Sequence, residues 1–142
     1  MKKKNVSLPD KLSDLLALAL RDMRAVKKLK SRVFDMDCFH YVRADGKCAM
    51  CMAGAVMDRT LGVSLHETCG PSNYDSRTSN KLWAIDSMRA GDARPVLYDS
   101  DKVCDTLKEF NTLVKKHWRR RLKRAPLSVY DKGVEILRAA GF

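Results

Sequence analysis

The residues best suited to chemistry lie in one short stretch near the C-terminus, at positions 115–124. Seven of these ten residues are Lys or Arg, and none is acidic. Guanidinium groups grip phosphate oxygens through paired hydrogen bonds, and lysine ammonium groups attract them as point charges. The stretch therefore predicts a site for a polyanion. Its cationic residues are Lys115, Lys116, Arg119, Arg120, Arg121, Lys123 and Arg124.

The charge of the whole chain is concentrated in this stretch. The formal net charge is +11, from 28 Lys and Arg against 17 Asp and Glu. Residues 115–124 supply +7, which leaves +4 for the rest. A solvated helix end is the alternative explanation, but one or two cations suffice to balance a helix dipole. We therefore favour nucleic acid as the partner, bound through its backbone, since no base-reading recognition helix is recognisable.

The basic stretch is predicted to end a long helix near residues 101–124. On such a helix its cations would line two adjacent faces at four-residue spacing. One face would carry Lys115, Arg119 and Lys123, and the next Lys116, Arg120 and Arg124.

Cysteines form the second group of chemically able residues. An odd count of five with no secretory signal argues against a disulfide framework. Cys48 and Cys51 are spaced as Cys-x-x-Cys and open an apolar run, which favours buried core residues of a helix. Two alternatives stay open, a redox pair and a zinc site. We expect no cofactor, and a zinc ion would need Cys38, Cys48, Cys51 and Cys69.

Catalytic motifs are scarce. The sequence contains no Gly-x-Ser-x-Gly, P-loop or His-Glu-x-x-His motif. His40 lies close in sequence to Asp35, Asp37 and Cys38, which makes a Cys-His-Asp cluster the nearest approach to one. We therefore predict a protein that is not an enzyme.

The pattern of apolar residues predicts a mainly α, single compact domain over residues 1–142. We expect about five helices with one or two short extended segments. The first helix begins at a cap formed by Ser7 and Asp10 and buries one face through Val26. Further helices are expected at 47–61, 79–90, 101–124 and from Ser128 to Gly141, extended segments at 33–42 and 95–98, and a loop at 63–77.

No targeting or membrane segment is expected. The basic start is followed by polar residues, and the apolar run at 15–20 is too short to cross a bilayer. These features predict a cytoplasmic protein without a membrane partner.

One segment resembles a known group of proteins. The run Phe39-His40, then Gly46-Lys47-Cys48-Ala49-Met50-Cys51-Met52-Ala53-Gly54-Ala55-Val56-Met57, is similar to small proteins encoded in tailed-bacteriophage genomes. The later Lys81-Leu82-x-Ala84-Ile85-Asp86-x-x-Arg89-x-Gly91 fits the same pattern, although Phe39 and Met52 stand where that pattern has Trp and Leu. The resemblance covers about residues 34–91 and implies an origin, and therefore a host bacterial cytoplasm, rather than an activity.

Three hypotheses follow for function. The leading one is a non-enzymatic phage accessory protein that binds nucleic acid through the basic stretch. The second is a counter-defence protein that sequesters a host nucleotide signal in a pocket formed by His40, Tyr41, Tyr74 and Arg89. The third is an inhibitor of a host protein. The oligomeric state is left open.

Overall fold

The computed structural model of the chain describes residues 7–63, 67–93 and 100–142. Within these ranges the protein is mainly α, with five α-helices and a small three-stranded sheet, which confirms the predicted fold class. The elements are α1 (Leu12–Lys27), β1 (Arg32–Phe34), β2 (His40–Val42), β3 (Cys48–Met50), α2 (Met52–Arg59), the 3₁₀ helix η1 (Pro71–Asn73), α3 (Ser76–Ala90), α4 (Ser100–Lys116) and α5 (Leu127–Ala139). The predicted extended segment at 95–98 lies outside the described residues.

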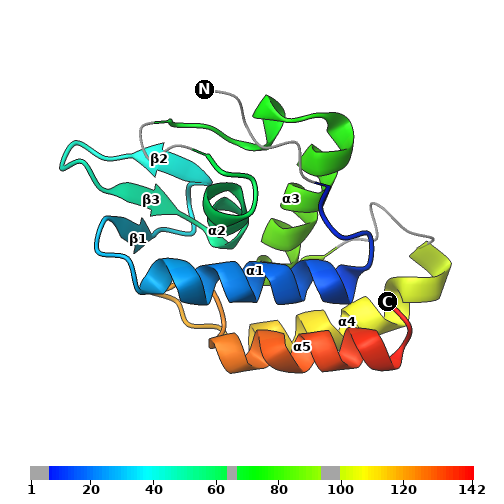
Figure 1. The fold of residues 1–142 in the computed structure, drawn as a ribbon. Helices are drawn as coiled ribbons and strands as arrows, with labels where there is room; N and C mark the ends of the chain where they lie inside the picture. Colours follow the sequence, from blue (N-terminus) through cyan, green and yellow to red (C-terminus); the bar gives the residue numbers. More distant parts are fainter. Residues whose placement is uncertain (1–6, 64–66, 94–99) are drawn as a thin grey trace.

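Helix α1 crosses the middle of the molecule and separates two layers (Figure 1). The sheet, α2 and α3 lie on one side of it, and the antiparallel pair α4 and α5 lies on the other. Its apolar stripe is fully buried between them, and includes Leu15, Leu16, Ala19 and Met23. No helix of the described residues is both long and apolar enough to cross a bilayer.

The start of α1 differs from the predicted cap. The N-cap residue is Lys11, and no side chain caps the helix. Asp10 instead accepts hydrogen bonds from Lys81 and Arg77 of α3, each at 2.8 Å. Arg77 and Lys81 lower the pKa of Asp10 to about 2, mainly through these bonds. The carboxylate of Asp10, which the local pattern predicted to cap α1, therefore pairs with α3 instead.

The predicted helix over 47–61 is wrong in its first third. Cys48–Met50 form the central strand β3, and α2 begins only at Met52. β3 pairs with β1 in parallel and with β2 antiparallel, so it is covered on both edges. An apolar run without a polar face fits a central strand as well as a buried helix, and periodicity alone cannot separate the two.

A backbone segment approaches α2 closely at Gly54. A Cβ atom placed there would overlap the backbone carbonyl of Phe39. The segment 33–42, predicted as one extended segment, instead contributes to two strands, because a turn separates β1 from β2. This turn and the close contact at Gly54 bring β2 against α2.

The predicted helix ends agree with the structure at some positions and differ from it at others. Gly91 ends α3 in the left-handed conformation, with φ of 71°, as the sequence indicated. Asp75 rather than a residue near 79 caps the start of α3, by accepting a hydrogen bond from the amide of Thr78. Helix α5 begins at Leu127, one residue before the predicted start at Ser128, and ends at Ala139 rather than near Gly141.

The predicted helix over 101–124 is also too long, because α4 ends at Lys116. Its buried stripe ends with Val114, and the next apolar residues, Trp118 and Leu122, are exposed. Further helical turns would pack against nothing while holding a dense run of like charges. The chain therefore leaves the helix and turns back toward α5.

Candidate functional site

The basic stretch forms a loop rather than the predicted helical stripe. We use the name basic loop for residues 117–124, which connect α4 to α5 (Figure 1, orange). Arg119 and Arg124 face each other across the loop, and the amide of Arg119 donates to the carbonyl of Arg124 at 2.9 Å. Because residues 117–124 are not helical, the four-residue spacing does not place their cations on a common face. Lys115 and Lys116 lie in the last turn of α4.

Contacts from three elements fix the basic loop in place. Arg89 of α3 donates to the carbonyl of Lys123 at 2.7 Å, and the Lys123 ammonium pairs with Asp37 from the turn between β1 and β2. Tyr130 of α5 accepts from the amide of Ala125 at 3.1 Å. Lys123 adopts a φ of 51°, which side-chain-bearing residues seldom do. Lys123 is thus held both at its backbone carbonyl, by Arg89, and at its ammonium group, by Asp37.

The cations of the stretch divide into paired and unpaired ones. Lys115 pairs with Asp92 at 3.1 Å, and Lys123 pairs with Asp37. Among the described residues, no acidic side chain pairs with the exposed guanidinium groups of Arg119, Arg120 and Arg121. Three adjacent like charges without counter-charges raise the local potential, which an external anion would relieve.

A pocket of about 510 Å³ lies between the basic loop and the sheet. Residues 121–124 form one wall. The other wall is the face of the sheet that carries Val33, Ala49 and Tyr41, which we call the outer face. This volume is within the range of small-ligand sites, about 300–1,000 Å³. From the strands and the residues that follow them, the pocket is lined by Val33, Phe34, Asp35, Met36, Tyr41, Arg43 and Ala49.

The four residues predicted to form a nucleotide pocket do not share one site. Tyr41 lines the pocket beside the basic loop, whereas His40, its neighbour in β2, is buried on the opposite face of the sheet. Arg89 is used to position the basic loop and pairs with Asp86 at 3.1 Å. Tyr74 directly follows η1, where burial raises the pKa of its hydroxyl. Arg43 was missed, and Asp35 was considered only beside His40. Their two-residue spacing from Tyr41 and Val33 was a usable signal for the pocket.

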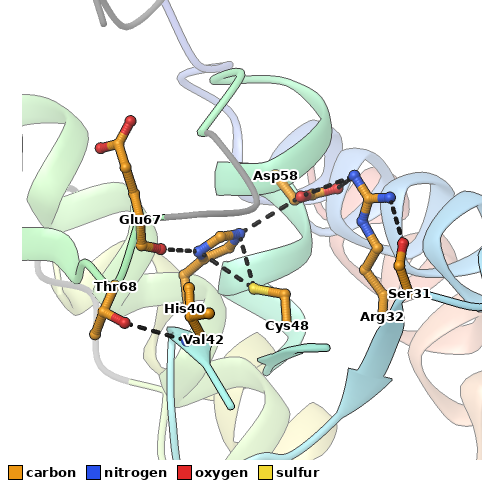
Figure 2. Close-up of polar contacts among 8 residues, drawn as sticks. All are labelled: Ser31, Arg32, His40, Val42, Cys48, Asp58, Glu67 and Thr68. Atoms are coloured by element: carbon orange, nitrogen blue, oxygen red, sulfur yellow. Dashed lines mark hydrogen bonds and ion pairs between the residues drawn. The ribbon is translucent and has the colours of Figure 1, made fainter. Parts of the chain in front are cut away.

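A Cys-His-Asp cluster does exist, with partners other than the predicted ones. Figure 2 shows His40 of β2 between Cys48 of β3 and Asp58 of α2. The imidazole Nε2 lies 3.3 Å from the Cys48 sulfur and 3.5 Å from an Asp58 oxygen. The imidazole Nδ1 lies 2.7 Å from the carbonyl oxygen of Glu67. Arg32 of β1 completes the cluster by pairing with Asp58 at 3.4 Å.

Burial decides what this cluster can do. The side chains of His40 and Asp58 are fully buried, and Cys48 has no exposed surface. Burial and the charge of Asp58 raise the pKa of the Cys48 thiol to about 11, which disfavours the nucleophilic thiolate. For Asp58, burial raises the pKa, but the His40 hydrogen bond and Arg32 outweigh it and the net pKa is lowered. The cluster is a neutral thiol beside a stabilised carboxylate, out of reach of a substrate.

The cysteines also fail to assemble the four-thiolate set considered for zinc. Cys51 accepts a hydrogen bond from the amide of Gly54 at 3.4 Å and so caps α2, while Cys48 faces His40. Burial raises the pKa of Cys51 to about 12 and that of Cys38 to about 11. The described residues contain no group of three or more His, Cys, Asp or Glu arranged to hold a metal ion.

Comparisons of this chain with protein-family models, with curated proteins and with solved structures find no match. The pocket and the basic loop are therefore interpreted from their own chemistry.

Proposed function

We propose that the protein binds nucleic acid through the basic loop and the pocket beside it. The proposal depends on one observation. Arg119, Arg120 and Arg121 are exposed, adjacent and without acidic partners in the described structure, next to a pocket of about 510 Å³. Exposed guanidinium groups without acidic partners bind phosphates favourably, because each can form paired hydrogen bonds with phosphate oxygens. Binding also releases the counterions that surround a polyanion, which adds to the affinity.

The shape of the loop supports binding to the phosphate backbone. Exposed cations on a turn can reach successive phosphates of a flexible strand, but they do not form a helix that fits the major groove. The contacts of Arg89 and Asp37 with Lys123 hold the loop in one conformation before a ligand arrives. Less conformational entropy is then lost on binding.

Salt titration tests this proposal. Binding of a fluorescein-labelled oligonucleotide is measured by anisotropy over a range of NaCl concentrations, for the wild type and for Arg119→Gln/Arg120→Gln/Arg121→Gln. Each lost single-strand phosphate contact flattens the slope of log K against log salt by about 0.7. Loss of all three flattens it by about 2, and weakens binding about 100-fold at 0.1 M salt.

A matched control separates this site from net charge. Lys11→Gln/Lys108→Gln/Lys132→Gln removes the same charge from exposed positions on other parts of the surface. The control should retain the wild-type slope. Equal losses in the two triple variants, or affinity that does not change with salt, would contradict the proposal. Thermal melting checks that both variants are folded, which their exposed positions favour.

A free nucleotide is the second candidate, because the pocket has the volume of a small-ligand site. It predicts that a mononucleotide raises the melting temperature of the protein while oligonucleotides do not bind.

A further inference from the structure

The outer face of the sheet forms a continuous floor for the pocket. In the strand register, Val33 of β1 is level with Ala49 of β3, and Ala49 is level with Tyr41 of β2. Side chains on one face of a strand recur every two residues, so Asp35 and Arg43 share the face of Val33 and Tyr41. All five residues line the pocket. Ala49 in the middle of this row is buried, and Tyr41 beside it is exposed.

Tyr41 is the exposed aromatic residue of this floor. Its accessible fraction is 52%, and it lies on β2, which pairs with β3 on one of its edges. An exposed aromatic ring on a sheet beside cations is a platform on which a nucleobase can stack, and stacking tolerates any base. Burial of a base there would also remove the apolar ring from water.

The two ends of the pocket carry opposite charges. β1 and β3 are parallel and β2 runs against them, so Asp35 after β1 and Arg43 after β2 stand at opposite ends of the sheet. A phosphate is attracted to Arg121 of the basic loop and to Arg43, whose pair with Asp45 at 3.0 Å is exposed to solvent, and it is repelled by Asp35. The carboxylate suits the donor groups on the edge of a base. The pocket is therefore matched to a nucleotide unit rather than to phosphate alone.

We propose that this pocket holds one unpaired base, stacked on Tyr41, of a single strand whose phosphates contact Arg43 and Arg121. The inference rests on the proposed function and adds the class of nucleic acid. A paired base inside a duplex has its faces covered by neighbouring base pairs, so the duplex can reach the basic loop but not the floor of the pocket. The protein then prefers single strands.

The test compares a single-stranded 12-mer of mixed sequence with the same strand in a duplex, by anisotropy at fixed salt. The wild type should bind the single strand about 10-fold more tightly, and Tyr41→Ala should remove that preference without changing duplex affinity. Tyr41→Phe keeps the ring and should bind like the wild type. Trp83→Ala removes an aromatic residue of similar exposure, 51%, from outside the pocket and should also retain the preference.

The possible outcomes separate this inference from the proposed function. Salt-dependent binding with equal affinity for both forms, or equal losses on both in Tyr41→Ala, would overturn the stacked base and leave the basic loop as the site. No salt-dependent binding to either form would overturn both proposals. Adenosine monophosphate that competes as well as the 12-mer would show that a free nucleotide is the ligand, and would also overturn the single-strand inference.

Discussion

Two neighbouring residues of β2 show how different the faces of this small sheet are. His40 is 1% exposed and contacts Cys48 and Asp58 beneath the sheet, whereas Tyr41 is 52% exposed and lines the pocket above it. The inner face carries residue types familiar from active sites but excludes a substrate. The outer face carries one acidic and one basic residue, Asp35 and Arg43, and it lies open beside the positively charged basic loop. Residue types alone do not distinguish the buried face from the open one.

The largest expected effect is the low reactivity of Cys48 on the inner face, compared with that of the exposed Cys104 on α4. Burial raises the pKa of Cys48 from the ordinary value of 9.0 to about 11. Its thiolate fraction at neutral pH is therefore lower by about 100-fold, and lack of access slows alkylation further. Mass spectrometry after iodoacetamide treatment at pH 7.5 should find exposed Cys104 modified first and Cys48 only after unfolding in urea.

Rapid alkylation of Cys48 in the folded protein would contradict this account. It would mean that the His40 cluster opens to solvent and holds an accessible thiolate, and would make it a candidate catalytic site.

The second prediction concerns the stability that the inner cluster provides. Asp58→Ala leaves Arg32 without its acidic partner and removes the carboxylate beside His40. Breaking a buried ion pair by removing one partner costs about 3–5 kcal/mol in the free energy of unfolding. Asp45→Ala removes a carboxylate that pairs with Arg43 at the surface, and should change stability little. Urea denaturation of the two variants measures the difference, and equal losses would refute a structural role for the cluster.

The sequence predicted the fold class and the helical core well, because amphipathic spacing reports directly on burial. It misassigned Cys48–Met50, because an apolar run on a central strand has no polar face to reveal its period. It extended α4 through the basic stretch, because charge spacing says nothing about whether a helix has a surface to pack against. Local patterns determine elements best where one face is buried and one is not.

The candidate site was only half predictable. The cations at 119–121 and Tyr41 stood out as residue types, but their proximity depends on the loop between α4 and α5 returning to the sheet. Asp58 was missed as the partner of His40, since 18 residues separate them in sequence. The phage origin that the resemblance implies stays a prediction, as do the host bacterial cytoplasm and the action on a host protein.

The smallest expected effect concerns the positioning of the basic loop. Arg89→Ala removes the hydrogen bond to the Lys123 carbonyl but leaves every cation of the loop in place. The loop must then be ordered on binding, which lowers affinity about 3- to 10-fold. The salt slope should not change, because the number of phosphate contacts is the same. A slope flattened by about 0.7 would instead show that Arg89 contacts a phosphate itself.

The central claim is that the outer face of the sheet and the basic loop together form the binding surface. The most direct measurement is a titration of isotope-labelled protein with a single-stranded oligonucleotide, followed by the backbone amide signals in two-dimensional NMR. The account predicts that the shifts concentrate at the outer-face residues 33, 35, 41, 43 and 49 and at residues 119–124. Shifts confined to α1 and α5, or an absence of shifts in the basic loop at saturating oligonucleotide, would contradict it.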